Sequence, residues 1–429
     1  MINRFFKNKL FRDVATLVGG TGIAQALPVL ISPILTRMYS PEEFGILAFY
    51  MAAIAIIGVA STGRYEMAVL LPKENIKAYN LAGFSVILSL AVSIATFAVL
   101  LIFGDRILEL FGFRPMPVLY YTIPAGIFAF ALFQISTFLL NRVQHYKGLA
   151  SAKIARSGGI SAGQILFGLT GFSTFGLVFG KLFGDLGSAI YAKWLANRNR
   201  AFKDSRYSRI IMKAEALTYR EMPKINAPHA VSTTLSNQLP NILLAGFFSP
   251  AIAGFYNLSF RVCYAPVMLI SGSVYQVYSR SVSDNQKEGD DIYRFTLSIV
   301  KKLALIALIP FSILLLFAPD LFDFIFGTEW RIAGFYAQLL TPMLFFSFIV
   351  SPVTYLPILF GYQRKAFFLD LIYLVLRIAA LSTGFFMDSA TIAIAGYSAV
   401  GVIFLVYLLF WLLSLTKKHN YQKDSPYMK

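Results

Sequence analysis

Long apolar stretches, separated by short polar ones, follow one another along almost the whole chain. Each has roughly the twenty residues that an α-helix needs to cross a bilayer. They lie at residues 13–35, 44–62, 79–104, 117–139, 154–171, 174–196, 228–248, 251–277, 296–318, 332–353, 366–386 and 390–415. None alternates apolar and polar positions as a transmembrane β-strand does. The pattern therefore predicts an all-α polytopic membrane protein with twelve transmembrane helices.

Composition agrees with this class and narrows the chemistry. Hydrophobic residues make up 57% of the 429 residues and charged residues 14%, against about 25% charged in soluble proteins. The single cysteine, Cys263, allows no disulfide within the chain. The three histidines are far apart, and no Gly-x-x-x-x-Gly-Lys-Ser/Thr run is present. We therefore expect no metal or nucleotide cofactor.

The net charge of +17 reflects topology rather than nucleic-acid binding, because the basic residues fall between the apolar stretches. With the N-terminus inside, four of the 38 lysines and arginines lie in outer segments and three lie within apolar stretches away from their inner ends, to which the basic residues of the inner segments extend. The outer four are Arg37, Arg106, Arg114 and Arg331, and the other three are Lys181, Arg261 and Arg377. All the rest lie in inner segments, which predicts that both termini are cytoplasmic and that no nucleic acid is a partner.

A short motif occurs twice and indicates an internal duplication. Segments 39–45 and 248–254 both read aromatic-Ser-Pro-x-x-x-Gly, with Pro41 and Pro250 lying 209 residues apart. Two further pairs recur in the same order, namely 103–112 with 317–327 and 144–147 with 363–365. We interpret these repeats as two halves of six helices each.

The two halves have the same orientation, because six is an even number of crossings. The predicted organisation is an N-terminal lobe at 1–200, a basic cytoplasmic linker at 201–225 and a C-terminal lobe at 226–429. A parallel repeat of this kind has its two-fold axis along the membrane normal and its substrate path near the bilayer midplane.

Charged residues inside the membrane are the first candidates for function, because each costs about 2.5–3.5 kcal/mol on insertion scales. Arg261 has no acidic residue at helical spacing within its own stretch. The planar guanidinium suits a diphosphate, to which it can donate two parallel hydrogen bonds. We expect Arg261 to contact the substrate or a gate, with an ion pair to another helix as the alternative.

Two further pairs of opposite charge lie within apolar stretches. Lys181 and Asp185 are four residues apart, and Asp370 and Arg377 are seven apart, so each pair shares one helix face. Each pair is either a structural ion pair or a pair in the substrate cavity that opens during transport. If transport is coupled to H⁺ or Na⁺, the acidic candidates are Asp185, Asp370 and Glu66.

The remaining candidates line the inner mouth or the predicted cavity. Arg64 and Glu66 follow the second stretch, and Arg156 begins the fifth. The first and seventh stretches are unusually polar, and Asn257 precedes Arg261 by one helical turn. The polar candidates for contact with a sugar are Gln25, Asn237 and Asn257. Close packing of helices through small residues is the alternative for the polar faces.

Two segments resemble the Wzx-type polysaccharide and O-antigen flippases of the multidrug/oligosaccharidyl-lipid/polysaccharide (MOP) exporter superfamily. The first is Thr36-Arg37-Met38-Tyr39-Ser40-Pro41-Glu42-Glu43-Phe44-Gly45, and the second runs from Arg64 to Pro72. The resemblance implies a MATE-like V of two six-helix lobes around a basic central cavity. It implies that Arg261, and also Arg64, contact the diphosphate of the substrate.

That substrate would be an undecaprenyl-diphosphate-linked oligosaccharide, moved by alternating access from the cytoplasmic to the outer leaflet of the bacterial inner membrane. The resemblance also implies a polysaccharide polymerase and a chain-length regulator as partners, beside the lipid bilayer. Two other functions stay open. A cation-coupled drug antiporter of the same superfamily would have carboxylates in its cavity, whereas this chain has mainly arginine and lysine there. A sugar polymerase or ligase would need a sizeable outer loop, and the outer loops are short.

Overall fold

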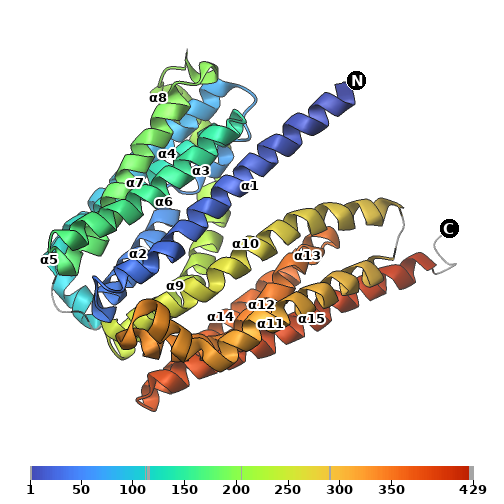
Figure 1. Cartoon of the computed structure of the whole chain (residues 1–429). Coiled ribbons are helices and arrows are strands. Elements are labelled where there is room, and N and C mark those ends of the chain that lie inside the picture. Colours follow the sequence, from blue (N-terminus) through green and yellow to red (C-terminus); the bar gives the residue numbers. More distant parts are fainter. Residues whose placement is uncertain (1, 112, 114–115, 204, 289–290, 425–429) are drawn as a thin grey trace. The chain divides into compact units, whose positions relative to one another are not determined.

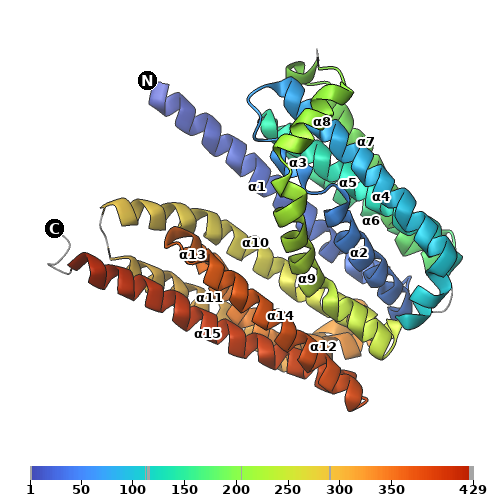
Figure 2. The same ribbon diagram turned by 180° about the vertical axis from the view of Figure 1, so that it is seen from behind.

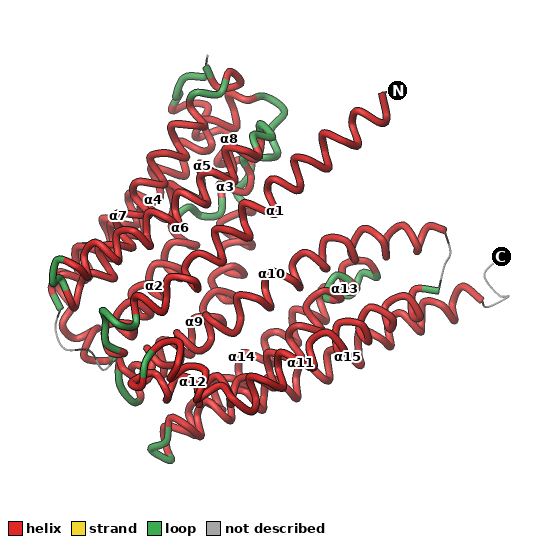
Figure 3. Tube along the Cα trace, viewed as in Figure 1, coloured by secondary structure: helices red, strands yellow, loops and turns green. Residues whose placement is uncertain are grey.

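The computed structural model describes residues 2–111, 113, 116–203, 205–288 and 291–424. Figure 3 shows that this part of the chain is drawn almost wholly as helix, and its elements include no strand. The long helices in the first part of the chain are α1 (Ile2–Leu35), α2 (Pro41–Ser61), α4 (Asn75–Leu110), α5 (Pro117–Arg142), α6 (Tyr146–Leu169), α7 (Ser173–Asn197) and α9 (Ala227–Phe247). Those that follow are α10 (Pro250–Glu288), α11 (Ile292–Phe326), α12 (Arg331–Val350), α14 (Gln363–Phe386) and α15 (Ala390–Asp424).

Each of the predicted apolar stretches lies on one of these long helices, so the prediction of an all-α polytopic protein is confirmed. Within the described residues, nine helices are long and apolar enough to cross a membrane. The remaining three, α6, α7 and α9, contain more charged or polar residues. Short helices fill connections between the long ones, namely α3 (Tyr65–Ala68), α8 (Arg209–Thr218) and α13 (Leu356–Leu359).

The chain divides into two compact units, Met1–Gly254 and Phe255–Lys429. The first unit includes α9, which the sequence repeat assigns to the second half and which packs against α2. The lobe boundaries at residues 200 and 225 stay a prediction from the repeat.

In the first unit, α5, α6 and α7 form a tightly packed group, with α1 along α6 (Figures 1 and 2). Gly180 and Gly184 of α7 lie directly against the backbone of Gln164 and Ile160 on α6. A side chain at either glycine would overlap with that backbone, so small residues set the spacing of the two helices. This close approach positions the charged residues described below.

The repeated Ser-Pro motifs begin two helices. Ser40 caps α2 through a capping box, in which Glu43 N donates to Ser40 Oγ and Ser40 N donates to Glu43 Oε2 at 2.7 Å. Proline at the first helical position has no N–H to satisfy, which suits both Pro41 and Pro250. Ile252 N donates to Ser249 Oγ at the start of α10.

The two motifs also contact each other within the first unit. A Cβ on Gly45 would overlap with the carbonyl oxygen of Pro250, and a Cβ on Gly254 would overlap with that of Pro41. The contact is therefore reciprocal, with each glycine facing the proline of the other motif, as in a two-fold interface. The duplication detected in the sequence corresponds to a self-complementary packing of backbone on backbone.

In the second unit, α12 packs against α11 and α15, and α15 also packs against α14 (Figure 1). Serines tie α10 to α12, because Ser259 Oγ donates to Ala333 O at 2.5 Å and Ser271 Oγ donates to Phe348 O at 3.1 Å. Trp330, at the turn before α12, is fully buried. Such hydrogen bonds between helices suit a lipid environment, where polar groups find no water.

Candidate functional site

A buried cluster of three charged residues lies where α6 meets α7. Asp185 on α7 accepts a hydrogen bond from Arg156 Nε of α6 at 2.7 Å, and its other oxygen accepts from Lys181 Nζ. The side chain of Asp185 is 1% exposed. The predicted pair of Lys181 and Asp185 is thus present, and Arg156, predicted at the inner mouth, is its third member. Two cations against one carboxylate leave a net positive charge in the interior.

Aromatic rings of α5 complete the surroundings of this cluster. The Arg156 guanidinium lies 4.6 Å from the ring centroid of Phe133 and 5.7 Å from that of Phe130. Cations are attracted to the faces of aromatic rings, and more strongly where water is excluded. Arg156 is therefore held by a carboxylate on one neighbouring helix and by rings on another.

Helix α1 is fastened to the same part of α6. Lys153 Nζ donates to Thr21 Oγ1 at 3.1 Å, and Ser157 Oγ donates to the carbonyl of Ala24. Gln25, predicted to contact a sugar, follows Ala24 and is half-buried. These two hydrogen bonds hold the polar face of α1 against α6, the helix that carries Arg156.

Arg64 and Glu66 form an ion pair with each other after α2. Arg64 Nη1 lies 3.2 Å from Glu66 Oε1, and Thr62 Oγ1 donates to Glu66 Oε2 at 2.5 Å. Glu66 is 2% exposed, and its burial raises the pKa of the carboxyl, although Thr62 and Arg64 oppose the rise. Arg64 has a φ of 60°, in the left-handed region that non-glycine residues rarely adopt.

Arg377 of the second unit lies among tyrosines. Its Nη2 donates to Tyr373 OH at 2.7 Å, and the guanidinium lies 3.9 Å from the ring centroid of Tyr373 and 5.0 Å from that of Tyr397. Arg377 Nε is buried and has no hydrogen-bond partner among the residues described. Arg377 thus contacts Tyr373 and Tyr397, and Asp370, the other member of the predicted pair, is exposed.

Three aromatic side chains of α10 stack on one another beside the tyrosines that contact Arg377. Tyr256, Phe260 and Tyr264 are four residues apart and stack with centroid distances of 5.8 and 4.8 Å. Tyr256 meets Tyr397 edge to face at 6.3 Å. These rings were not among the predicted site residues, although their i, i+4, i+8 spacing in the sequence places them on one helix face.

The other predicted residues lie on α9 and α10. Arg261 and Asn257 are half-buried on α10, one helical turn apart, and Asn237 is exposed on α9. No group of three or more histidine, cysteine or acidic side chains that could hold a metal occurs in the described residues. The predicted charged residues are mainly arginine and lysine, whose guanidinium and ammonium groups can bind an anionic substrate.

Comparison with known proteins gives a family and a fold. The model of the family described as polysaccharide biosynthesis protein matches residues 34–334. No curated protein sequence matches the chain significantly. The predicted resemblance to polysaccharide-exporting membrane proteins is thus confirmed at the level of the family.

Several solved structures of MOP superfamily transporters share the fold. The lipid II flippase MurJ in an inward closed conformation has 15% identity and a TM-score of 0.72, and the match covers 95% of this chain and 93% of that one. An inward-facing multidrug resistance MATE family transporter has 14% identity, a TM-score of 0.63, and coverage of 94% and 95%. A MOP superfamily transporter from Pyrococcus furiosus has 16% identity, a TM-score of 0.56, and coverage of 94% and 96%. The predicted MATE-like fold class is confirmed by these matches.

Proposed function

We propose, since the chain belongs to the polysaccharide biosynthesis protein family, that it is a flippase for lipid-linked oligosaccharides. Its substrate is an undecaprenyl-diphosphate-linked repeat unit, which it moves from the cytoplasmic to the outer leaflet of the bacterial inner membrane. The proteins that share its fold are transporters and a flippase rather than enzymes. One of them is a flippase of lipid II.

The observation that carries this proposal is the excess of cations in the membrane interior. Arg156 and Lys181 share a single carboxylate, and Arg377 lies against tyrosine rings. An interior with more cations than carboxylates attracts a diphosphate and repels the organic cations that many drugs are. A flippase therefore fits these residues better than the drug antiporter of the same superfamily.

The proposed mechanism is alternating access with the lipid tail left in the bilayer. Arg261 and Arg377 bind the diphosphate through charge-assisted hydrogen bonds. Arg64 guides it at the cytoplasmic mouth, and the side-chain amides of Gln25, Asn237 and Asn257 bind sugar hydroxyls. Arg156, Lys181 and Asp185 act as an ion cluster that stabilises the first unit and keeps its interior positive.

Coupling to H⁺ or Na⁺ through Asp185 would require an ion to compete with two protein cations. Arg156 and Lys181 both donate to this carboxylate, so each of its oxygens already has a protein cation as partner. Asp370 is exposed, and Glu66 lies outside the long helices. Of the three, Glu66 is therefore our proposal for a proton-binding group, because its burial raises the pKa.

We also propose the orientation that the distribution of charge predicts, with both termini in the cytoplasm. In this orientation the product of flipping reaches the outer leaflet, where a polysaccharide polymerase and a chain-length regulator would use it. The protein is a multi-pass membrane protein.

The test is flipping of an undecaprenyl-diphosphate-linked oligosaccharide in proteoliposomes. We expect Arg261→Ala and Arg377→Ala to reduce the initial rate at least tenfold, and Arg261→Lys to reduce it less, because charge is retained without the bidentate geometry. Arg331→Ala is the matched control, since Arg331 is exposed and ion-paired with Asp320 and Asp323.

Full activity of both Arg261→Ala and Arg377→Ala would contradict the proposed roles. The function itself would be wrong if deletion of the gene caused no accumulation of a lipid-linked oligosaccharide on the inner leaflet. Drug sensitivity in place of that accumulation would identify an antiporter.

A further inference from the structure

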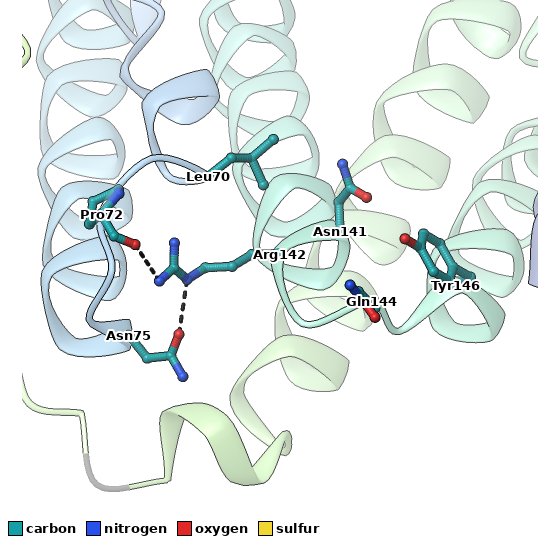
Figure 4. Close-up of a pocket in the computed structure, with 7 residues that line it drawn as sticks. All are labelled: Leu70, Pro72, Asn75, Asn141, Arg142, Gln144 and Tyr146. Atoms are coloured by element: carbon teal, nitrogen blue, oxygen red, sulfur yellow. Dashed lines mark hydrogen bonds between the residues drawn. The ribbon is translucent and has the colours of Figure 1, made fainter. Parts of the chain in front are cut away.

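A small polar pocket lies at one end of the first unit, outside the charged cluster. Its volume is about 360 Å³, at the lower end of the roughly 300–1,000 Å³ of small-ligand sites. It is lined by Leu70, Pro72, Asn75, Asn141, Arg142, Gln144 and Tyr146 (Figure 4). These residues come from the connection between α3 and α4 with the first residue of α4, and from the connection between α5 and α6 with the helix ends that flank it. Both connections are predicted to face the cytoplasm.

Arg142 gives this pocket a fixed shape. Its guanidinium donates to Val69 O at 2.8 Å, to Pro72 O at 2.7 Å and to Asn75 Oδ1 at 2.9 Å, with a longer bond of 3.3 Å to Lys73 O. The connection between α3 and α4 is thereby tied to the end of α5 (Figure 4). A wall held by four hydrogen bonds is formed before any ligand arrives, which lowers the entropic cost of binding.

The charge of Arg142 is not neutralised by these contacts. All its acceptors are carbonyl or amide oxygens, and it takes part in no ion pair within the described part of the chain. Lys147, five residues after Arg142 in the sequence, is exposed and adds a second positive charge. The pocket therefore has a positive potential that favours an anionic group.

Three neutral polar side chains face the pocket without internal hydrogen bonds. Figure 4 shows the hydroxyl of Tyr146 directed toward Asn141 and Gln144. Over residues 2–111, 113, 116–203, 205–288 and 291–424, none of these side chains forms a hydrogen bond with the protein. Gln144 also has a φ of 53°, a conformation that costs energy in a residue other than glycine. Amides both donate and accept, as neighbouring sugar hydroxyls require.

We propose that this pocket binds a phosphorylated sugar, with the phosphate near Arg142 and the hydroxyls on Asn141, Gln144 and Tyr146. The proposal rests on the proposed function and deepens it, because the pocket would be a loading site where the sugar diphosphate of the substrate binds before it crosses the membrane. The segment 144–147 recurs at 363–365, and the proposed substrate cavity gives no reason for it. In this proposal the segment contributes Gln144 and Tyr146 to the binding of the sugar. The same chemistry would also accept a soluble nucleotide sugar.

The test is calorimetric titration of the full-length protein in detergent with N-acetylglucosamine 1-phosphate, glucose 1-phosphate, UDP-glucose, inorganic phosphate and methyl glucoside. We expect saturable binding of a sugar 1-phosphate, at least tenfold tighter than that of phosphate or methyl glucoside. UDP-glucose also contains a sugar diphosphate, so UMP, which has the nucleotide without the sugar, is titrated beside it. Binding of UMP as tight as that of UDP-glucose would overturn the loading role, because the site would then recognise the nucleotide and not the sugar.

Two variants locate the binding. Asn141→Asp has nearly the same shape and places a carboxylate beside Arg142, so we expect it to abolish binding of the phosphorylated sugar. Tyr146→Phe should weaken binding about threefold to tenfold, whereas Tyr121→Phe, an exposed tyrosine on α5, should leave it unchanged. Replacement of Arg142 is avoided, because it ties the backbone of the wall.

Each outcome decides the proposal. Absence of binding to both sugar 1-phosphates, or binding that Asn141→Asp and Tyr146→Phe leave unchanged, would overturn it. Equal affinity for inorganic phosphate would reduce the site to an anion site and overturn its role in sugar recognition. Flipping is measured separately in proteoliposomes, so a protein that binds the sugar phosphate but does not flip refutes the proposed function and leaves the pocket assignment standing.

Discussion

Asp185 lies between Arg156 and Lys181 in the interior of the first unit, so one carboxylate of α7 joins a cation of α6 to a cation of its own helix. Breaking a buried ion pair leaves a charge that has lost both water and its partner. In contrast, ion pairs at the surface contribute little, because water and salt screen them.

We predict that Asp185→Asn destabilises the protein by about 3–5 kcal/mol, because the buried Lys181 and the half-buried Arg156 then face a neutral amide. Thermal unfolding in detergent would measure this as a fall in Tm. Asp320→Asn, which removes the exposed one of the two acidic partners of Arg331, is the matched control and should cost about 0–1 kcal/mol. Equal Tm values for the two variants would show that Asp185 is not an essential partner of the cations.

Glu66 predicts a dependence of stability on pH. Its folded-state pKa is raised above the usual 4.5 by burial. Between pH 4.5 and the raised pKa, the native protein therefore keeps a proton that the unfolded chain has lost. Its stabilising contribution is full below pH 4.5 and is lost as the pH rises through the folded pKa. We expect the difference in Tm between wild type and Glu66→Gln to shift in this window, with wild type losing stability relative to the variant. A difference independent of pH would refute the raised pKa.

The sequence predicted these residues only in part. Lys181 and Asp185 were paired from their spacing, because i and i+4 always share a helix face. Arg156 was placed at an inner mouth and turned out to be the third member of the cluster. Which residue Arg156 contacts depends on how α6 is rotated about its axis against α7. The sequence of neither helix alone determines that rotation.

At the scale of elements, the reciprocal contact between the starts of α2 and α10 restricts the choice of residue most strongly. Gly45 and Gly254 each face the carbonyl of the opposite proline, with no room for a side chain. Backbone cannot move aside as the end of a flexible side chain can. The repeated glycine is thus required by packing and not by a turn.

We predict that Gly45→Ala and Gly254→Ala each lower the Tm markedly, because either methyl group forces α2 and α10 apart. Gly187→Ala on α7 is the control, since a Cβ there meets nothing within 4 Å. Alanine also favours the helical conformation by about 1 kcal/mol over glycine, so this control should be neutral or stabilising. A fall in Tm of the same size for all three variants would contradict the close contact.

The location of the long helices followed from the sequence, but their lengths did not in every case. The third apolar stretch was predicted at 79–104, whereas α4 extends from Asn75 to Leu110. Polar residues can continue a helix into water, so hydropathy marks the part inside the membrane and not the ends of the helix. The short helices α3, α8 and α13 were not predicted, because they are too short for a periodic apolar pattern.

At the scale of the whole molecule, the distribution of basic residues predicts the orientation in the membrane. We expect Lys213→Cys, in the basic segment around α8, to react with a maleimide only when the reagent can enter intact cells. Met387→Cys, in the turn between α14 and α15, should react with an impermeant maleimide added outside. Both residues are exposed, so accessibility of the protein surface does not limit labelling.

The background for this labelling is Cys263→Ser, because Cys263 is the single cysteine of the chain and is buried. Wild-type protein serves as the control and should remain unlabelled in intact cells. Labelling of Lys213→Cys from outside, or protection of Met387→Cys, would reverse the proposed topology.

The sequence by itself determined that the protein is a helical membrane protein, where its long helices lie, and that its interior contains more cations than carboxylates. These properties are local, because helical hydrogen bonds join residues four apart and membrane insertion depends on the apolar content of one stretch. Only the tertiary structure decided which residues meet. Arg156 joins Asp185, Arg377 joins two tyrosines, and Gly45 meets Pro250 across more than two hundred residues. Such contacts depend on the rotation and spacing of packed helices, which arise when small residues and rings of several elements fit together at once.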